Sequence, residues 1–262
     1  NFNYSENDLS ASIASTTTDN LKDSGYQTRN IGFGLGTSFE QYDNLYFTPS
    51  LNASFEDLST TSNASATLKK QEGNYFDLNL PYTLTYNMTN RSYQPSEGYN
   101  ATWLQNLPLV SDTYEIVNGF EINKYQTLAS DMVGKVSIFG RAANSIAGDD
   151  IRLSKRLYLP SNKLRGFKNG QIGPKTGKKY IGGNYMSSIN FSSTLPQILP
   201  SFQNTDFTVF VDTANVWGVD HNGSEDESSK IRSSFGFAMD ILTPVGPMNF
   251  SLAQPITKKK YK

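Results

Sequence analysis

The sequence contains no cysteine and a single histidine. Its 262 residues therefore offer neither a disulfide framework nor a cysteine-based metal site. The histidine, His221, lies in a polar run, which argues against a histidine-dependent catalytic triad or zinc site. The 23 basic and 24 acidic residues leave a net charge of −1, so we expect no polybasic face and no nucleic-acid partner.

Long apolar runs are missing as well. No stretch of about 18 apolar residues occurs, so the sequence predicts no transmembrane helix. The chain opens on Asn1-Phe2-Asn3-Tyr4, with neither a starting methionine nor a signal peptide, and we therefore expect a piece of a longer, processed protein. The 31 Tyr and Phe residues (15 and 16) stand against a mean hydropathy of −0.49, so the chain is aromatic-rich yet polar overall.

Alternation of apolar and polar residues is the dominant pattern. Between Phe76 and Met88, every second residue is apolar, and the positions between are polar apart from Pro81. A period of two is typical of a strand with one apolar face. No stretch shows a helical period over 12 residues. The pattern predicts eleven strands, near 8–18, 25–40, 45–57, 72–89, 97–108, 113–128, 132–144, 183–195, 205–217, 231–242 and 246–256.

The connections between these strands favour a membrane barrel over a soluble fold. Many strands reach the 9–11 residues or so that cross a bilayer at a tilt. Short connections such as 129–131 alternate with long ones such as 58–71, as in outer-membrane barrels with short turns at one end. A soluble β-sandwich or jelly roll also alternates, with its apolar face packed inward. We expect an all-β, transmembrane antiparallel β-barrel of the outer-membrane type.

The longest connection, residues 145–182, carries the most distinctive segment. Within it lie Leu164-Arg165-Gly166-Phe167 and Ile172-Gly173-Pro174. An arginine on a loop that folds back into a barrel needs an acidic or carbonyl partner on the inner wall. In the strand 207–212, Phe207, Val209 and Val211 face one way, so Asp212 faces the lumen. We therefore expect a loop folded into the lumen, with Asp212 as the partner of Arg165.

These segments resemble the sixth extracellular loop of the BamA family of outer-membrane assembly factors, in the bacterial surface antigen superfamily. The downstream runs 212–217, 243–247 and 250–255 strengthen the resemblance. It implies a sixteen-stranded barrel, of which residues 1–262 would be a single domain holding strands five to fifteen. The first four strands, the last strand and the periplasmic POTRA domains would then lie outside. It also implies that Arg165 contacts two inner-wall residues, Asp212 and, in place of a second acid, Asn190.

The resemblance implies a function in the outer membrane of a Gram-negative bacterium, as a multi-pass barrel. The protein would help nascent β-barrel clients fold and insert, and accessory lipoproteins would bind through the POTRA domains. Two alternatives are a two-partner secretion or autotransporter-assembly transporter of the same superfamily and, from other classes, a passive porin or an outer-membrane enzyme. No nucleophile–base pair or carboxylate pair is identifiable, so we expect no catalytic residue, no metal, no cofactor and no enzyme activity.

Overall fold

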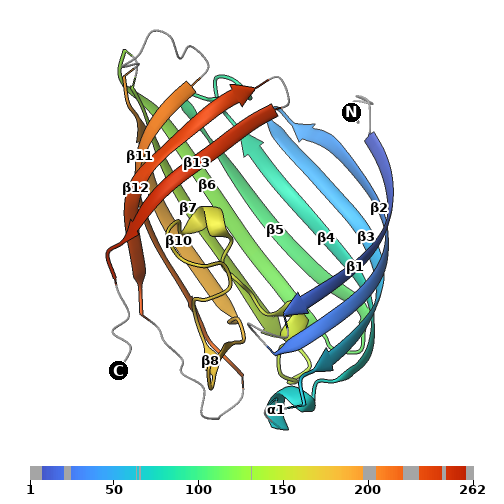
Figure 1. The fold of residues 1–262 in the computed structure, drawn as a ribbon. Helices are drawn as coiled ribbons and strands as arrows, with labels where there is room; N and C mark the ends of the chain where they lie inside the picture. The colour runs from blue at the N-terminus through green and yellow to red at the C-terminus, as the bar shows by residue number, and fades with distance from the viewer. Residues whose placement is uncertain are drawn as a thin grey trace.

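The main element of the computed structural model is one curled antiparallel sheet of eleven strands around a lumen (Figure 1). The structure describes residues 8–20, 25–62, 64, 66–130, 132–196, 205–220, 230–243 and 246–257. His221, Pro244 and Val245 lie outside the described residues. The strands of the sheet, in spatial order, are β1 (Asp8–Asn20), β2 (Tyr26–Tyr42), β3 (Leu45–Thr60), β4 (Gly73–Asn87), β5 (Gly98–Ser111), β6 (Glu115–Ala129), β7 (Met132–Ser145), β10 (Tyr185–Thr194), β11 (Thr205–Trp217), β12 (Arg232–Thr243) and β13 (Gly246–Pro255).

All eleven predicted strands are present, with bounds that differ by at most three residues. Every strand pairs antiparallel with its neighbour in the order, and the described sheet is open between β1 and β13. Within the described residues, the sequence analysis missed only short elements: α1 (Ala66–Lys69), the 3-10 turns η1 (Leu153–Lys155) and η2 (Ser161–Lys163), and the hairpin of β8 (Lys175–Thr176) with β9 (Lys179–Tyr180). Elements of two to four residues are too short to show a period.

The apolar face of the strands points outward. On β12, Phe235 and Phe237 are exposed, whereas Ser234 and Ala238, which flank this pair, are buried on the lumen side. A β-sandwich would bury the apolar face and leave the polar face in water. The opposite arrangement here is that of a barrel with a lipid-facing surface, so the expected fold class is confirmed.

The described residues contain no helix that is long and apolar enough to cross a membrane.

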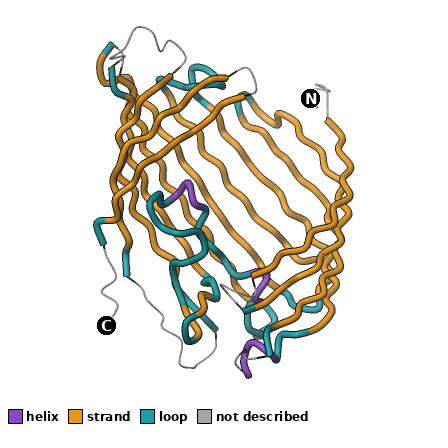
Figure 2. Tube along the Cα trace, viewed as in Figure 1, coloured by secondary structure: helices purple, strands orange, loops and turns teal. Residues whose placement is uncertain are grey.

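The two ends of the sheet differ, and Figure 2 shows the difference as loops and turns in teal. One end carries the connections 61–72, 146–184 and 218–231, and we call it the long-loop end. The other carries 43–44, 88–97 and 130–131, and we call it the short-turn end. The connection 146–184, which we call the lumen loop, runs from the long-loop end into the interior of the curled sheet (Figures 1 and 2). This loop occupies the space where a soluble β-protein has its core.

The outward apolar face generates a test on one strand. Val211, near the middle of β11, is 43% exposed on the outer face. We expect Val211→Arg to destabilise the barrel in lipid by about 2–4 kcal/mol, because the charge enters the bilayer. Thr208→Arg on the same strand is the control: it places the charge in the lumen near Asp206 and Asp240. Urea unfolding in lipid vesicles, followed by tryptophan fluorescence, measures both; equal losses would contradict the assigned faces.

Candidate functional site: the lumen loop and its anchors

The tip of the lumen loop is held by the pair of Arg165 and Asp212. The side chain of Asp212, on β11, has no exposed surface. Arg165 reaches it through three N–H groups: Nε lies 2.8 Å from Oδ2, Nη2 lies 2.8 Å from Oδ1, and the backbone N lies 3.1 Å from Oδ2. The two side-chain bonds form a bidentate fork, the strongest form of this interaction. The structure thus brings together the two residues that the sequence analysis paired.

Asn190 lies on the inner wall beside the Arg165–Asp212 pair, where the sequence analysis expected it, but it bonds to Asp212 rather than to Arg165. Its Nδ2 donates to Asp212 Oδ1 at 2.9 Å and to the backbone oxygen of Lys163 at 2.8 Å, while its Oδ1 accepts from Ser188. It lies opposite Asp212 in the register of β10 and β11. The prediction that Asn190 binds Arg165 was therefore wrong in its partner: the amide nitrogen is a donor, as the guanidinium is, so both converge on the same carboxylate.

The guanidinium of Arg165 also lies on an aromatic face. Its Cζ is 3.3 Å from the centroid of the Phe210 ring, and Phe210 is the preceding lumen-facing residue of β11. A cation over a ring is stabilised by the ring quadrupole. The side chain of Arg165 is 20% exposed, so the contact is only partly shielded from solvent. Together, Phe210 and Asp212 form a preformed seat for one arginine.

The remaining motif residues pack into an apolar cluster between loop and wall. Leu164 and Ile172 are buried there, Phe167 packs against them from the side, and Pro174 is fully buried nearby. The wall contributes lumen-facing side chains of β7, β10 and β11, and the cluster as a whole comprises Phe139, Ala143, Ile151, Leu157, Leu159, Leu164, Ile172, Met186, Ala214 and Val216. The motif of the loop is therefore the contact surface by which it fills the lumen.

Two glycines of the motif are required by close approach of the backbone to the wall. Gly166 has a φ of 83°, and a Cβ there would lie 2.9 Å from Ala253 Cβ on β13. Gly173 has a φ of 104°, and a Cβ there would lie 2.8 Å from Val216 Cγ1 on β11. Both positions combine a backbone conformation that favours glycine with a lack of space. The loop can touch β11 and β13 only because these residues have no side chain.

The sequence analysis missed further charged contacts of the loop. Lys163 Nζ lies 2.7 Å from Glu121 on β6 and 4.9 Å from the centroid of the Phe139 ring. Arg152, which is 1% exposed, lies among three carboxylates of β3, β4 and β6. The sequence did show acidic residues at the polar positions of several strands. Alternation within a strand, however, does not tell which residue of the loop each of them meets across the lumen.

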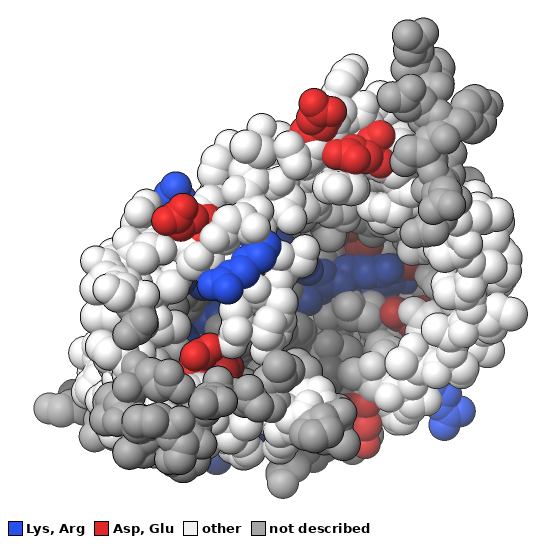
Figure 3. All heavy atoms as spheres, turned by 90° about the horizontal axis from the view of Figure 1, so that it is seen from above, with Lys and Arg blue, Asp and Glu red and all other residues white. Residues whose placement is uncertain are grey.

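A polar cavity of about 740 Å³ lies between the loop tip and the short-turn end. Lys163 and Arg165 line it from the tip, and the turn 88–97 lines it from the other side. This turn reaches across the lumen: Gln94 Nε2 lies 2.5 Å from Asp206 Oδ2 on β11. Figure 3, seen from the short-turn end, shows basic (blue) and acidic (red) side chains inside the hollow. A lumen lined by both signs of charge is usual for such barrels.

The contacts of the site hold the loop in place on the wall. Among the described residues, no group of three or more His, Asp or Glu is arranged to hold a metal ion. The charged groups of the loop tip are used in ion pairs with the wall. The arrangement fixes a 39-residue connection, residues 146–184, in one place inside the sheet. These features define an outer-membrane-type β-barrel with an internal loop.

The chain belongs to the Omp85 superfamily, because the model of the Omp85 superfamily domain matches residues 1–262. Among curated proteins, the outer membrane protein assembly factor BamA of Neisseria meningitidis is 26% identical in an alignment of 125 residues that covers 37% of this chain and 15% of that protein. The chain thus spans about one seventh of this relative's length.

Solved structures agree with the fold. BamA from Haemophilus ducreyi lacking POTRA domains 1–3 matches with a TM-score of 0.84 and 24% identity, over 97% of this chain and 56% of that one. CdiB from Acinetobacter baumannii matches with a TM-score of 0.61 and 11% identity, over 97% of this chain and 45% of that one. The expected likeness to a BamA-type barrel is confirmed.

The anchoring pair generates a stability test. We expect Asp212→Asn to destabilise the folded barrel by about 2–4 kcal/mol, since it leaves the Arg165 charge without its counter-ion; partial exposure of Arg165 keeps the loss below the extreme for buried pairs. Asp206→Asn is the control, because its partner Gln94 is neutral, and it should cost about 1 kcal/mol or less. Urea unfolding in detergent measures both. Equal midpoints for Asp212→Asn and the unmodified protein would exclude an anchoring role.

The glycine contacts generate a second test. Gly173→Ala should cost about 2–4 kcal/mol, because it adds backbone strain to an overlap with Val216. Gly177→Ala is a matched control with a φ of 60° and nothing within 4 Å of the added Cβ, so strain alone should cost about 1 kcal/mol. The heat-induced shift of the folded barrel on a gel compares the two. The close approach of the loop is refuted if Gly173→Ala is the milder change.

Proposed function

We propose that this chain is the barrel of an outer-membrane protein assembly factor, a multi-pass protein of the bacterial outer membrane that helps nascent β-barrel proteins fold and insert. The observation that carries the proposal is the similarity to a curated relative with this name, over 125 residues. The internal loop supports the proposal. Arg165 is hydrogen-bonded to Asp212 on the wall, and such a contact suits a barrel that must keep its shape while a client protein folds beside it.

The proposed activity needs positioning and no covalent chemistry. A client strand pairs by main-chain hydrogen bonds with an open strand edge, as in other cases of strand addition. The interior strands β2 to β12 cannot offer such an edge, because both of their sides are paired. The client therefore pairs at the seam of the barrel, and the lumen loop supports the wall behind that seam. Accessory lipoproteins would bind outside the described strands.

A transporter of the CdiB type is the second candidate. The likeness of fold to CdiB also covers 97% of the chain, and both candidates lie within the same superfamily. The TM-score with CdiB is lower than that with the BamA structure, 0.61 against 0.84, which supports the first candidate. The two candidates differ in their product: an assembly factor leaves folded barrels in the outer membrane, whereas a transporter releases an exported passenger.

Depletion of the complete protein in its host, with complementation by variants, tests the proposal. We expect Arg165→Ala to reduce folded, heat-modifiable barrel proteins in the outer membrane severalfold, because the loop loses its anchor on Asp212. Lys178→Ala, an exposed lysine between β8 and β9, is the control and should complement fully. Depletion that leaves outer-membrane barrels at normal levels but stops secretion of one passenger would favour the transporter; no effect on either would refute both.

A further inference from the structure

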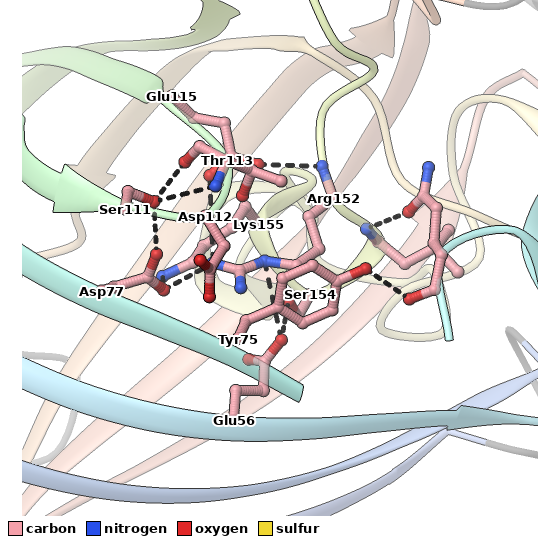
Figure 4. A network of polar contacts seen from close by, with 12 residues as sticks. Glu56, Tyr75, Asp77, Ser111, Asp112, Thr113, Glu115, Arg152, Ser154 and Lys155 are labelled. Atoms are coloured by element: carbon pink, nitrogen blue, oxygen red, sulfur yellow. Dashed lines mark hydrogen bonds and ion pairs between the residues drawn. The ribbon is translucent and has the colours of Figure 1, made fainter. Parts of the chain in front are cut away.

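Another arginine of the lumen loop, Arg152, is buried outside the segment that the motif covers, and its partners differ from those of Arg165. Arg152 precedes η1 at the long-loop end, and its side chain is 1% exposed. Its Nη2 lies 2.5 Å from Asp77 Oδ2 on β4 and 4.0 Å from Glu115 Oε2 on β6, and its Nε lies 3.7 Å from Glu56 Oε1 on β3. Figure 4 shows the guanidinium among side chains from these strands.

The neighbours of Arg152 on the loop bind the same carboxylates. The backbone N of Arg152 donates to Glu115 Oε1 at 3.0 Å, Ser154 Oγ donates to Glu56 Oε1 at 2.6 Å, and Lys155 Nζ lies 3.0 Å from Asp77 Oδ2. The ring of Tyr75 lies under the guanidinium, with 4.3 Å from Cζ to its centroid (Figure 4). A short stretch of loop, residues 152–155, therefore meets three strands at once.

An apolar cluster lies beside these charges and extends the contact. Leu153 and Ile181, from the two arms of the loop, are buried with Leu58 of β3 and Tyr26 of β2. Both arms are thereby held on the same wall. The strands β2, β3 and β4 of this side are not those that the tip contacts, since Lys163 meets β6, and Arg165 and Gly166 meet β11 and β13.

We propose that Arg152 is the positioning residue of a second, electrostatic anchor, and that the lumen loop is a brace between two walls of the barrel. Arg152 holds the arms on β3, β4 and β6, and Arg165 holds the tip on β11. A loop fixed at one place can pivot, whereas a loop fixed at two keeps both walls at a set separation. This inference concerns the position of the loop, so it goes beyond the proposed function and does not depend on it.

The net charge of the cluster predicts what the loss of Arg152 does. Arg152 and Lys155 carry two formal positive charges against three carboxylates, and replacement of Arg152 by a neutral residue leaves one cation for three acids. Removal of one partner from a buried charge cluster leaves uncompensated charge, which is the costly outcome. If the role of Arg152 is electrostatic, removal of one carboxylate should therefore compensate for its loss.

Cysteine labelling of the complete protein in detergent tests the two anchors separately. The chain has no cysteine of its own, so one introduced residue gives one reactive site. Ile181→Cys reports on the arms and Leu164→Cys on the tip, since both positions are buried. We expect Arg152→Met to raise the maleimide labelling rate of Ile181→Cys about tenfold or more while that of Leu164→Cys changes less than about twofold. Arg165→Met should raise the labelling rate of Leu164→Cys and leave that of Ile181→Cys nearly unchanged.

Compensation and a control complete the design. Adding Glu56→Gln to Arg152→Met should return labelling at Ile181→Cys most of the way to the starting rate, and Arg152→Lys, which keeps the charge, should give an intermediate rate. Arg29→Met, which replaces an exposed arginine of β2 at the same end, should change the labelling rate at neither reporter.

Three outcomes would each overturn the second anchor: unchanged labelling in Arg152→Met, an equal rise at both reporters, or no recovery with Glu56→Gln. If Arg152→Met does not fold, the double variant with Glu56→Gln decides: recovered folding supports the electrostatic anchor, and failure to fold overturns it.

Discussion

The carboxylate of Asp212 is the group on which the arrangement of the loop tip depends. It has no exposed surface, and an isolated carboxylate in such a place would cost several kcal/mol. Four N–H donors converge on it, three from Arg165 and one from Asn190, which matches the four lone-pair sites of a carboxylate. Because these donors come from the loop and from β10, one ionised group fixes the tip and the strand pair beside it together.

The lumen loop takes the place that a hydrophobic core takes in a soluble protein. The outer face of the strands is apolar, so the interior is left with polar and charged side chains that need partners. The loop supplies them: Lys163 pairs with Glu121, and Arg152 lies among Glu56, Asp77 and Glu115. It also supplies apolar residues, which pack against β7, β10 and β11. Packing and charge pairing thus reinforce each other, and the loop and the barrel wall depend on each other for their shape.

Much of the fold and the centre of the site could be predicted from the sequence, for identifiable reasons. The period of two marks each strand, and the same alternation puts Asp212 on the lumen face opposite Val211. The predicted contact between Asn190 and Arg165 was wrong because the sequence places both residues near Asp212 but does not show that both donate to its carboxylate. Arg152 was missed because its partners lie 96, 75 and 37 residues earlier, on three strands, and only closure of the wall around the loop brings them together.

The alternation of residues along the chain is local, and it determines the strands and their two faces, while the loop segment 164–167 identifies the anchoring arginine. Tertiary structure decided what alternation leaves open: which face meets lipid, how far the loop enters the lumen, and which carboxylate each cation reaches. The physical reason is the separation along the chain between the residues involved. A period is a property of neighbouring residues, whereas an ion pair such as Arg152 with Asp77 requires 2.5 Å between atoms that only the curled sheet places side by side.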